Sequence, residues 1–314
     1  MKHEYRNKND HPINVKRILL YCIIGAFLGA AALVCRQYAV GVGRHPVPAQ
    51  AKAAVAAPNH HFFSGQSRSA AKKQTSAAAT VTSFYPPPKP GHGRVQIAIV
   101  LDDFGNSYQN IEAVMNINRP MTFSILPHLP YSKKISERVH RRGFEAILHL
   151  PMEAHKEDRP VRSEPGTITT AMNQDEIISR MESALACTPY VEGVSNHQGS
   201  KATESEAVMR PLLLALKKKG LFFFDSFSSG KSVGAKVARE TGIRFARRDV
   251  FLDNNEDFKA IKAEMDILVK RAKKNGYAIG IGHDRKRTVA ALALLVMEAE
   301  KEGVEFVPLS RLIR

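Results

Sequence analysis

Residues 95–105 read VQIAIVLDDFG, an apolar run that ends in two adjacent carboxylates and a Phe-Gly pair. Its length and its content of Val and Ile predict a buried strand, and the acidic pair marks the strand's end. Downstream, short apolar runs alternate with longer amphipathic stretches. The runs cover 95–101, 121–126, 144–150, 191–195, 221–224, 243–246, 277–281 and 304–307. Helical periodicity covers 108–117, 133–142, 174–186, 205–219, 233–241, 257–274 and 288–302.

Strand and helix patterns alternate seven or eight times between residues 94 and 314. This alternation predicts parallel strands joined by helical crossovers, either in a closed barrel or in a doubly wound sheet. Several predicted helices are followed by glycine, which can close a helix in the left-handed conformation: Gly143, Gly220, Gly276 and Gly303. No Gly-x-Gly-x-x-Gly loop follows the first strand, which disfavours a dinucleotide-binding sheet. We therefore expect an α/β barrel over residues 94–314.

The chain before this region has a different composition. Residues 18–35 form an apolar run preceded by Lys16 and Arg17, and its 18 residues just suffice to cross a membrane. The excess of basic residues over 1–17 predicts a cytoplasmic N-terminus and export of everything that follows. We expect a single-pass inner-membrane anchor with a periplasmic domain; a cleaved signal, which would release that domain into the periplasm, is the less favoured alternative.

Residues 36–93 are rich in Ala, Pro, Ser and Lys, and such a segment buries too little apolar area to fold, so it is predicted to be a disordered tether. Up to residue 93 there are 12 basic and 2 acidic residues, a net of +10 out of +16 for the chain. Charge concentrated in this way is typical of membrane topology or of a solvated linker. No basic patch with interleaved aromatic residues is present, so a nucleic-acid partner is not expected.

The three cysteines are Cys22, Cys35 and Cys187, and only the last lies in the predicted barrel. No Cys-x-x-Cys spacing occurs, which excludes a zinc site built from thiolates. Cys187 is interpreted as a small apolar residue near the end of a helix.

Polar side chains gather directly after the predicted strands, where the active sites of α/β barrels lie. The acidic pair Asp102 and Asp103 ends the first strand, and adjacent buried carboxylates repel unless a cation or a shared proton relieves them. The alternative for a single Asp is a helix cap. The other residues at strand ends are His149, Glu153, Asn196, His197, Asp225, Ser226, Arg248, Asp249, Asp253 and His283.

Asp103, His149 and His197 together offer one carboxylate and two imidazoles from three strand ends. This donor set suits a divalent metal, with zinc expected and nickel, cobalt or iron as alternatives. Taken singly, each histidine is more often a core or loop residue bonded to the backbone. Glu153 and His155 are reserve ligands.

His283, between Gly282 and Asp284, suits a proton donor or an oxyanion-binding group, with Asp249 or Asp253 orienting its ring. The alternative is a residue that merely neighbours the N-terminus of the 288–302 helix. Arg248 and Asp249 are candidates for a buried pair near the site.

The stretch from residue 97 to 309 resembles the divergent polysaccharide deacetylase family of bacterial envelope proteins. The resemblance rests on IAIVLDDFG (97–105), HLPME (149–153), SNHQGS (195–200), FFFDS (222–226), ARRDVFLDN (246–254) and AIGIGH (278–283), in this order. It implies a deformed (β/α) barrel of about seven parallel strands. It also implies that Asp102 is a catalytic base, that Asp103 is a metal ligand, and that His283 matches a late-strand histidine of the ordinary enzymes.

Ordinary polysaccharide deacetylases take two ligands from a His-x-x-x-His motif, whereas here Glu153 stands four residues after His149. We assign the third ligand to His197. The resulting hypothesis is removal of N- or O-acetyl groups from an envelope or peptidoglycan-type glycan. Asp102 would take a proton from water, and His283 would protonate the leaving group. The alternative is a barrel on a membrane tether that binds a glycan or an envelope protein without catalysis, because a fold does not fix a function.

Overall fold

The computed structural model describes residues 94–158 and 164–314. The predicted cytoplasmic segment 1–17, membrane anchor 18–35 and tether 36–93 lie outside the described residues. Within the described ranges, no helix is both long enough and apolar enough to cross a membrane.

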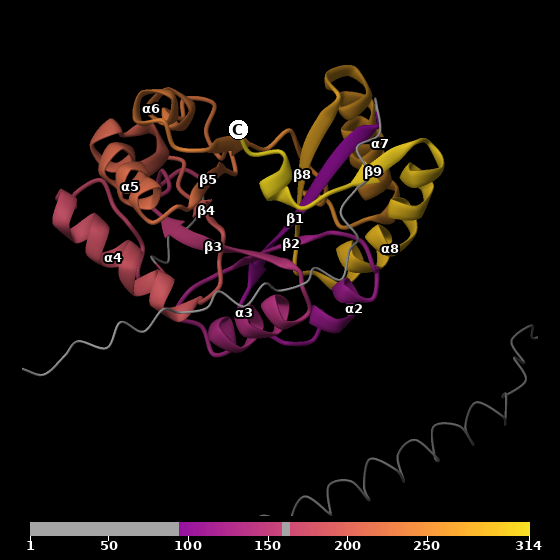
Figure 1. The fold of residues 1–314 in the computed structure, drawn as a ribbon, viewed down its shortest axis with the longest axis horizontal. Helices are drawn as coiled ribbons and strands as arrows, with labels where there is room; N and C mark the ends of the chain where they lie inside the picture. Colours follow the sequence, from indigo (N-terminus) through magenta and orange to yellow (C-terminus); the bar gives the residue numbers. More distant parts are fainter. Residues whose placement is uncertain (1–93, 159–163) are drawn as a thin grey trace, which may run out of the picture. The chain divides into compact units, whose positions relative to one another are not determined.

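The described residues form one sheet of nine strands, all paired in parallel (Figure 1). The strands are β1 Val95–Phe104, β2 Thr122–Ile125, β3 Glu145–Met152, β4 Gly193–Gln198, β5 Phe222–Asp225, β6 Phe245–Arg247, β7 Val250–Phe251, β8 Tyr277–His283 and β9 Val304–Phe306. Their order is β6-β5-β4-β3-β2-β1-β8-β7, and β9 pairs with the first residues of β1.

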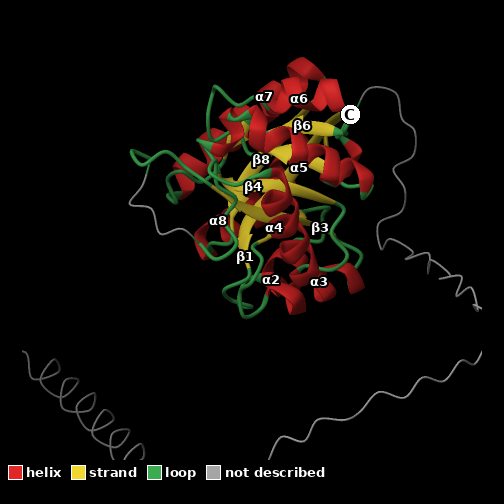
Figure 2. Ribbon diagram, turned by 90° about the vertical axis from the view of Figure 1, so that its left-hand side faces the viewer, coloured by secondary structure: helices red, strands yellow, loops and turns green. Residues whose placement is uncertain are grey.

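Helices connect the strands and cover the outer face of the sheet (Figure 2). They are α2 Ile111–Met115, α3 Ser132–Arg141, α4 Gln174–Cys187, α5 Glu206–Lys218, α6 Gly234–Thr241, α7 Phe258–Asn275 and α8 Lys286–Lys301. Short 3-10 turns form at Ala202–Glu204 and Leu309–Arg311. The four glycines predicted to close helices all have φ between 72° and 89°, in the left-handed region. Each predicted helix is present, although the 108–117 stretch is helical only over α2.

The sheet is strongly curled, and the strands at its two ends, β6 and β7, follow each other directly in the chain. Only Arg248 and Asp249 separate β6 from β7. The backbone N–H of Arg248 donates to Asp225 on β5, whereas that of Asp249 donates to Ile279 on β8. The bent segment that contains β6 and β7 thus pairs with β5 at one edge of the sheet and with β8 at the other. The two edges lie close together, because two residues span at most about 7 Å. The ladder breaks at that bend, so the described strands make a split barrel and not a doubly wound sheet.

Strand alternation sorts the side chains into an outer and an inner set. On β1, Ile97, Ile99 and Leu101 pack against the helices, whereas Ala98 and Val100 face inward. The inner set fills the barrel and is capped by the C-terminal segment: Ala98, Val100, Ile147, Phe222, Phe224, Ile279, Ile281, Val307, Leu309, Leu312 and Ile313. At inward position 193 a Cβ would lie 2.2 Å from the Phe222 ring, which explains the glycine there.

The sequence-based fold differs from the structure in two respects. Eight apolar runs and a barrel of about seven strands were expected, and nine strands are present in the described ranges; the two-residue β7 is the strand for which no run was predicted, because it is too short for a clear pattern. The sixth strand was expected at 243–246 and lies at Phe245–Arg247.

Candidate active site

The carboxyl ends of the strands bring the predicted polar residues to one end of the barrel. Alternation extends the inward series of β1 to Asp102, that of β3 to His149 and that of β8 to His283. In the β1–β8 ladder Asp102 lies directly beside His283. The two-residue alternation of the strands is therefore enough to place these three side chains on the inner face of the barrel.

Asp103 departs from this alternation. A regular strand would point it away from Asp102, but its φ is 70° and the β1–β2 register shifts between Leu101 and Phe104. Such a bulge redirects a side chain, and Asp is among the few residues that tolerate a left-handed backbone. Both carboxylates consequently lie near the same histidine, His149.

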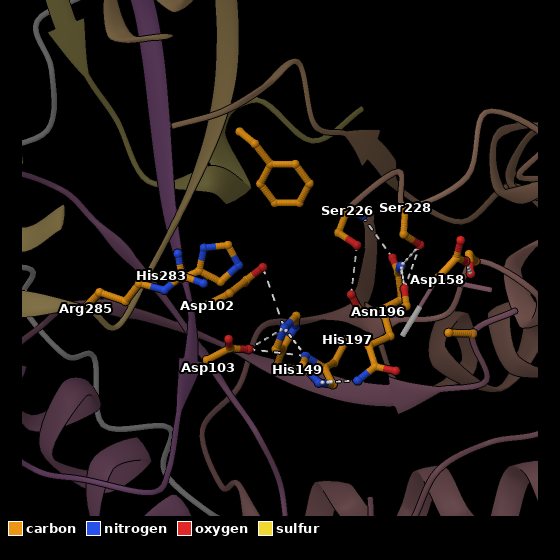
Figure 3. Close-up of a pocket in the computed structure, with 14 residues that line it drawn as sticks. Asp102, Asp103, His149, Asp158, Asn196, His197, Ser226, Ser228, His283 and Arg285 are labelled. Atoms are coloured by element: carbon orange, nitrogen blue, oxygen red, sulfur yellow. Dashed lines mark hydrogen bonds and ion pairs between the residues drawn. The ribbon is translucent and has the colours of Figure 1, made fainter. Parts of the chain in front are cut away.

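Asp103, His149 and His197 converge on one point (Figure 3). Asp103 Oδ1 lies 3.4 Å from His149 Nε2 and 3.2 Å from His197 Nδ1. The two imidazole nitrogens are 3.1 Å apart. One ligand atom from each residue lies within 4.8 Å of the others. The structure thus brings together the three residues predicted as metal ligands, and their role as ligands remains a prediction.

Carboxylates and imidazole rings lie close together in this cluster, and each shifts the pKa of the other. Burial alone would raise the pKa of Asp103, but hydrogen bonds and charge from His149 and His197 hold that pKa far below its usual range. Burial alone would lower the pKa of His197, yet Asp103 and Glu164 raise it to about 10. A site that holds a carboxylate ionised beside two ring nitrogens is suited to a positive charge.

The donor chemistry fits a divalent cation. Asp103 Oδ1 is buried, and the two ring nitrogens of the cluster are the groups that face it; a buried oxygen is costly unless its partners satisfy it, and a cation among these three atoms would do so. Two imidazoles and a carboxylate leave further positions open, as catalytic zinc sites do.

Asp102 stands next to the cluster. Its side chain is 3% exposed, and Oδ2 lies 3.6 Å from His149 Nε2. Its Oδ1 is buried without a hydrogen-bond partner. Burial raises the pKa of Asp102 above its ordinary value, despite the opposing charge of His149. A carboxylate with a raised pKa and a free oxygen is suited to taking up a proton.

His283 is oriented by Asp253. His283 Nδ1 lies 2.7 Å from Asp253 Oδ1, and Oδ2 accepts hydrogen bonds from the His283 backbone and from Thr288. Burial alone would lower the pKa of His283, but Asp253 outweighs it and the pKa is raised. Because Nδ1 is engaged, Nε2 is the ring nitrogen left for chemistry.

A cavity of about 210 Å³ joins these groups. Asp102, Asp103, His149, His197 and His283 line it, together with Ala154, Asp158, Asn196, Gln198, Ser200, Ser226, Ser228, Phe251 and Arg285. In Figure 3, Asn196, Ser226 and Ser228 lie across the cavity from His283 and Arg285. The ring of Phe251 stacks at 15° to His283 and lies 3.7 Å below the Arg248 guanidinium. Phe251 is therefore a packing residue at the cavity wall.

Asn196 and Ser226 are engaged with each other. Asn196 Oδ1 accepts from the Ser226 backbone N–H, and the Ser226 hydroxyl donates to the Asn196 backbone carbonyl. The Asn196 amide donates to Gln198 and Ser228. Both residues line the cavity, but these bonds mainly tie the end of β4 to that of β5.

Besides the reserve ligand His155, five predicted positions lie outside the cavity lining: Asp253, which orients His283, and four whose side chains bond elsewhere. Glu153 accepts from Thr170 and pairs with Lys201, so its carboxylate is not offered as a reserve ligand. Asp225 accepts from Phe227 and Ser232. Arg248 donates to the carbonyls of Ser226 and Phe227, and Asp249 accepts from Ile279.

These contacts correct several expectations. Arg248 and Asp249 do not form a buried pair, because each bonds to the backbone of a different strand edge. Of the two carboxylates offered for orienting His283, Asp253 does so and Asp249 does not. The second reserve ligand, His155, pairs with Glu204 at 3.2 Å.

Glu164 is a site residue that the sequence reasoning missed. Its Oε1 lies 3.2 Å from His197 Nε2, on the opposite side of the ring from Asp103. The hydrogen bond from His197 lowers the pKa of Glu164. Glu164 lies in the connection between β3 and α4, where no periodic pattern or strand end points to it.

The sequence profile of the divergent polysaccharide deacetylase family matches residues 99–313. This chain belongs to that family. Two relatives are each 33% identical to it: the uncharacterized protein YibQ of Escherichia coli and an uncharacterized protein of Haemophilus influenzae. Those alignments cover 64% and 63% of this chain, with 62% of the E. coli protein and 69% of the H. influenzae one. The matched region thus spans less than two thirds of the E. coli relative.

Among solved structures, the uncharacterized protein ATU2773 from Agrobacterium tumefaciens superposes with a TM-score of 0.67 at 24% identity. The superposition covers 72% of this chain and 92% of that one. The likeness shows a shared fold.

Proposed function

We propose that this protein is a metal-dependent hydrolase that removes acetyl groups from an envelope glycan. The observation that carries the proposal is the convergence of Asp103, His149 and His197 beside Asp102, which lines the same cavity and has one oxygen without a hydrogen-bond partner. Membership of the divergent polysaccharide deacetylase family supports the choice of reaction. Zinc is the proposed ion, with nickel, cobalt and iron as alternatives.

Each group in the cavity has a role in this hydrolysis. A divalent cation held by Asp103, His149 and His197 would polarise the acetyl carbonyl and make water more nucleophilic. Asp102 accepts the proton of the attacking water on Oδ1. His283 donates a proton from Nε2 to the departing nitrogen or oxygen as its bond to the acetyl carbon breaks. The products are acetate and a free amine or hydroxyl on the sugar.

The substrate class follows from chemistry and from the family. Most of the residues that line the cavity have polar side chains, as an acetylated sugar requires. We extend the proposal to location: the apolar run at 18–35 and the basic residues before it would anchor the chain in the inner membrane with its barrel in the periplasm.

Acetate release tests the reaction directly. The full-length chain would be loaded with zinc, cobalt or nickel and incubated with N-acetylglucosamine oligomers and with peptidoglycan fragments. We expect acetate and new free amines in equal amounts from the wild type. Asp102→Asn should abolish this release while metal remains bound, because Asp102 is a base and not a ligand.

Two outcomes contradict the proposal in different ways. If the wild type binds no transition metal, the hydrolytic mechanism fails. If it binds metal and glycan without releasing acetate, the chain is a glycan-binding barrel, the non-catalytic alternative.

A further inference from the structure

Five residues form a polar wall on one side of the cavity, away from His283. They are Asp158, Asn196, Ser200, Ser226 and Ser228, and all of them line the cavity. Four of them lie together in Figure 3, and Ser200 adjoins this group because its hydroxyl donates to Asp158. The hydrolysis proposed above uses none of these five side chains. Their hydrogen bonds decide which groups of a ligand they can still bind.

Every side-chain proton of the polar wall is already donated within the protein. The pairs are Ser226 Oγ with the Asn196 carbonyl, Ser228 Oγ with the Gln198 carbonyl, Ser200 Oγ with Asp158 Oδ2, and Asn196 Nδ2 with both the Gln198 carbonyl and Ser228 Oγ. Carbonyl and carboxylate oxygens can only accept, so the serines must be the donors in their bonds to them. The polar wall therefore has no proton left to donate.

Lone pairs on the same wall remain unused. A serine oxygen and each oxygen of a carboxylate can accept two hydrogen bonds. Among the described residues, no group donates to Ser226 Oγ or to Asp158 Oδ1. Ser228 Oγ receives one bond, from the Asn196 amide. Ser226 is 4% exposed, and a buried oxygen without a partner costs free energy, so the polar wall suits a ligand that brings donors.

Asp158 is the strongest acceptor of the polar wall. Its carboxylate is charged, and hydrogen bonds to charged groups are roughly twice as strong as bonds between neutral groups. The Ser200 hydroxyl holds Oδ2, and Oδ1 remains for a ligand. A sugar hydroxyl can donate to this oxygen. A carboxylate or phosphate in the same place would set acceptor against acceptor and like charge against like charge.

Two further lining residues, apart from the histidines, carry N–H groups, and neither belongs to the polar wall. Gln198 Nε2 lies 3.3 Å from His197 Nε2, in the proposed metal cluster. Arg285 lies beside His283 in Figure 3 and donates to the Asp253 carbonyl. An acidic group of a ligand would thus meet donors near His283 and only acceptors at the polar wall.

We propose that the polar wall selects the sugar: Asp158 Oδ1 accepts a hydrogen bond from a hydroxyl of the substrate, with Ser226 and Ser228 as further acceptors. The substrate is then an acetylated sugar that carries a free hydroxyl at this position, and a sugar with a carboxylate or phosphate there is rejected. The inference rests on the proposed function in taking an acetylated sugar as the ligand. It needs neither the cation nor the base, because it concerns binding alone.

Fluorinated sugars test the requirement for a donor. The ligands are the methyl glycoside of N-acetylglucosamine and its analogues with fluorine in place of the hydroxyl at C3, C4 or C6. Fluorine is similar in size to a hydroxyl and cannot donate a hydrogen bond. Kd is measured by NMR titration of the metal-free, full-length chain, in which no turnover interferes. We expect one analogue to bind about 10-fold more weakly than the parent sugar. A phosphate ester of the same hydroxyl should bind more weakly still.

Substitutions assign the lost bond to Asp158. Asp158→Ala should weaken binding of the parent sugar by about 10-fold and leave the affinity for the weak fluorinated analogue unchanged, so that the two sugars bind alike. Asp158→Asn keeps an acceptor oxygen and gains an N–H donor. It should recover part of the affinity for the parent sugar and bind the phosphate ester more tightly than the wild type does.

Glu157→Ala is the matched control. Glu157 is an exposed carboxylate next to Asp158 that does not line the cavity, so this variant should keep the difference between the parent sugar and the weak analogue. Asp158 is also exposed, so the variants should keep the fold, and denaturation curves check this.

The outcomes separate this inference from the proposed function. A difference between the two sugars that vanishes in Asp158→Ala and persists in Glu157→Ala supports the inference. If such a wild type releases no acetate, the proposed hydrolysis fails and the sugar-binding role of the polar wall stands. The inference is overturned, even if acetate is released, when the parent sugar does not bind, when all the fluorinated sugars bind as tightly as the parent, or when the difference persists in Asp158→Ala. Equal loss of the difference in Glu157→Ala also overturns it.

Discussion

Asp102 and Asp103 are adjacent in the chain, and their carboxylates nevertheless lie 3.6 Å and 3.4 Å from the same nitrogen, His149 Nε2. Neighbouring residues of a strand normally point to opposite faces. The left-handed φ of 70° at Asp103 removes that constraint. The site can therefore hold one carboxylate for a cation and keep the other for a proton, at the cost of local backbone strain.

Two substitutions of Asp103 distinguish the effect of its carboxylate on metal binding from the effect of its backbone strain on stability. Asp103→Gly and Asp103→Ala both delete the proposed ligand, so both should weaken cobalt or zinc binding by at least 10- to 100-fold. Only glycine adopts the left-handed backbone freely. The free energy of unfolding of the glycine variant should therefore be about 1 kcal/mol higher than that of the alanine variant. Urea denaturation of the metal-free proteins measures this difference. Equal stabilities would mean that φ at Asp103 carries no strain.

The Asp253–His283 pair predicts a split between chemistry and metal binding. His283→Ala should lower kcat for acetate release by about 10²- to 10⁴-fold, the usual contribution of a proton donor, and leave the metal Kd unchanged. Asp253→Asn should also lower kcat, because an amide cannot accept all three hydrogen bonds that Asp253 receives from His283 and Thr288.

Asp249→Asn is the control for that pair. Asp249 accepts from the Ile279 backbone and does not line the cavity, so this variant should lose stability and keep kcat. A loss of kcat in Asp249→Asn as large as that in Asp253→Asn would contradict the assignment of the orienting carboxylate.

Strand periods and strand ends made much of this arrangement predictable. Asp102, His149 and His283 follow apolar runs, and period-2 alternation alone places them on the inner face. The sequence could not show that Asp103 joins them, because its direction depends on a backbone angle. It could not distinguish Asp249 from Asp253, since both follow the sixth strand and only the break at Arg248 and Asp249 decides which meets His283.

Two further features left no local signal. Ser124 and Ser195 are ordinary residues in strand patterns, and the contacts of their hydroxyls with each other and with His149 appear only when β2, β3 and β4 are aligned. Glu164 lies in a connection without periodicity, and it reaches His197 only in three dimensions.

Glu164 should act on metal binding through His197. With His197 Nδ1 turned toward the cluster, Nε2–H donates to Glu164 and so fixes the ring. Glu164→Ala should raise the Kd for zinc or cobalt by about 10- to 100-fold. Glu164→Gln should fall between it and the wild type, because an amide oxygen still accepts this hydrogen bond. Dye competition measures each Kd.

Glu157→Gln serves as the comparison, since Glu157 is an exposed carboxylate in the same connection. It removes one negative charge near the site without touching His197. If it raised Kd as much as Glu164→Ala does, general electrostatics and not the His197 hydrogen bond would explain the effect.

Glu145 predicts how stability depends on pH at the opposite end of the barrel. It is 6% exposed and accepts hydrogen bonds from Thr122 and from the Ser310 backbone. Burial, together with the charge of Glu192, outweighs these bonds and raises the pKa of Glu145 from 4.5 to about 7. The folded state thus holds this proton more tightly than the unfolded chain does. The free energy of unfolding should therefore fall as the pH rises from about 4.5 to 7.

Glu145→Gln mimics the protonated carboxyl and should remove this contribution. The variant should match the wild type near pH 4.5 and exceed its unfolding free energy by roughly 3 kcal/mol at pH 8. The pKa of Glu192 is also raised, so a smaller fall with pH should persist in the variant and diminish in Glu192→Gln. Urea denaturation at several pH values measures both curves. Parallel curves for Glu145→Gln and the wild type would show that Glu145 keeps an ordinary pKa in the folded protein.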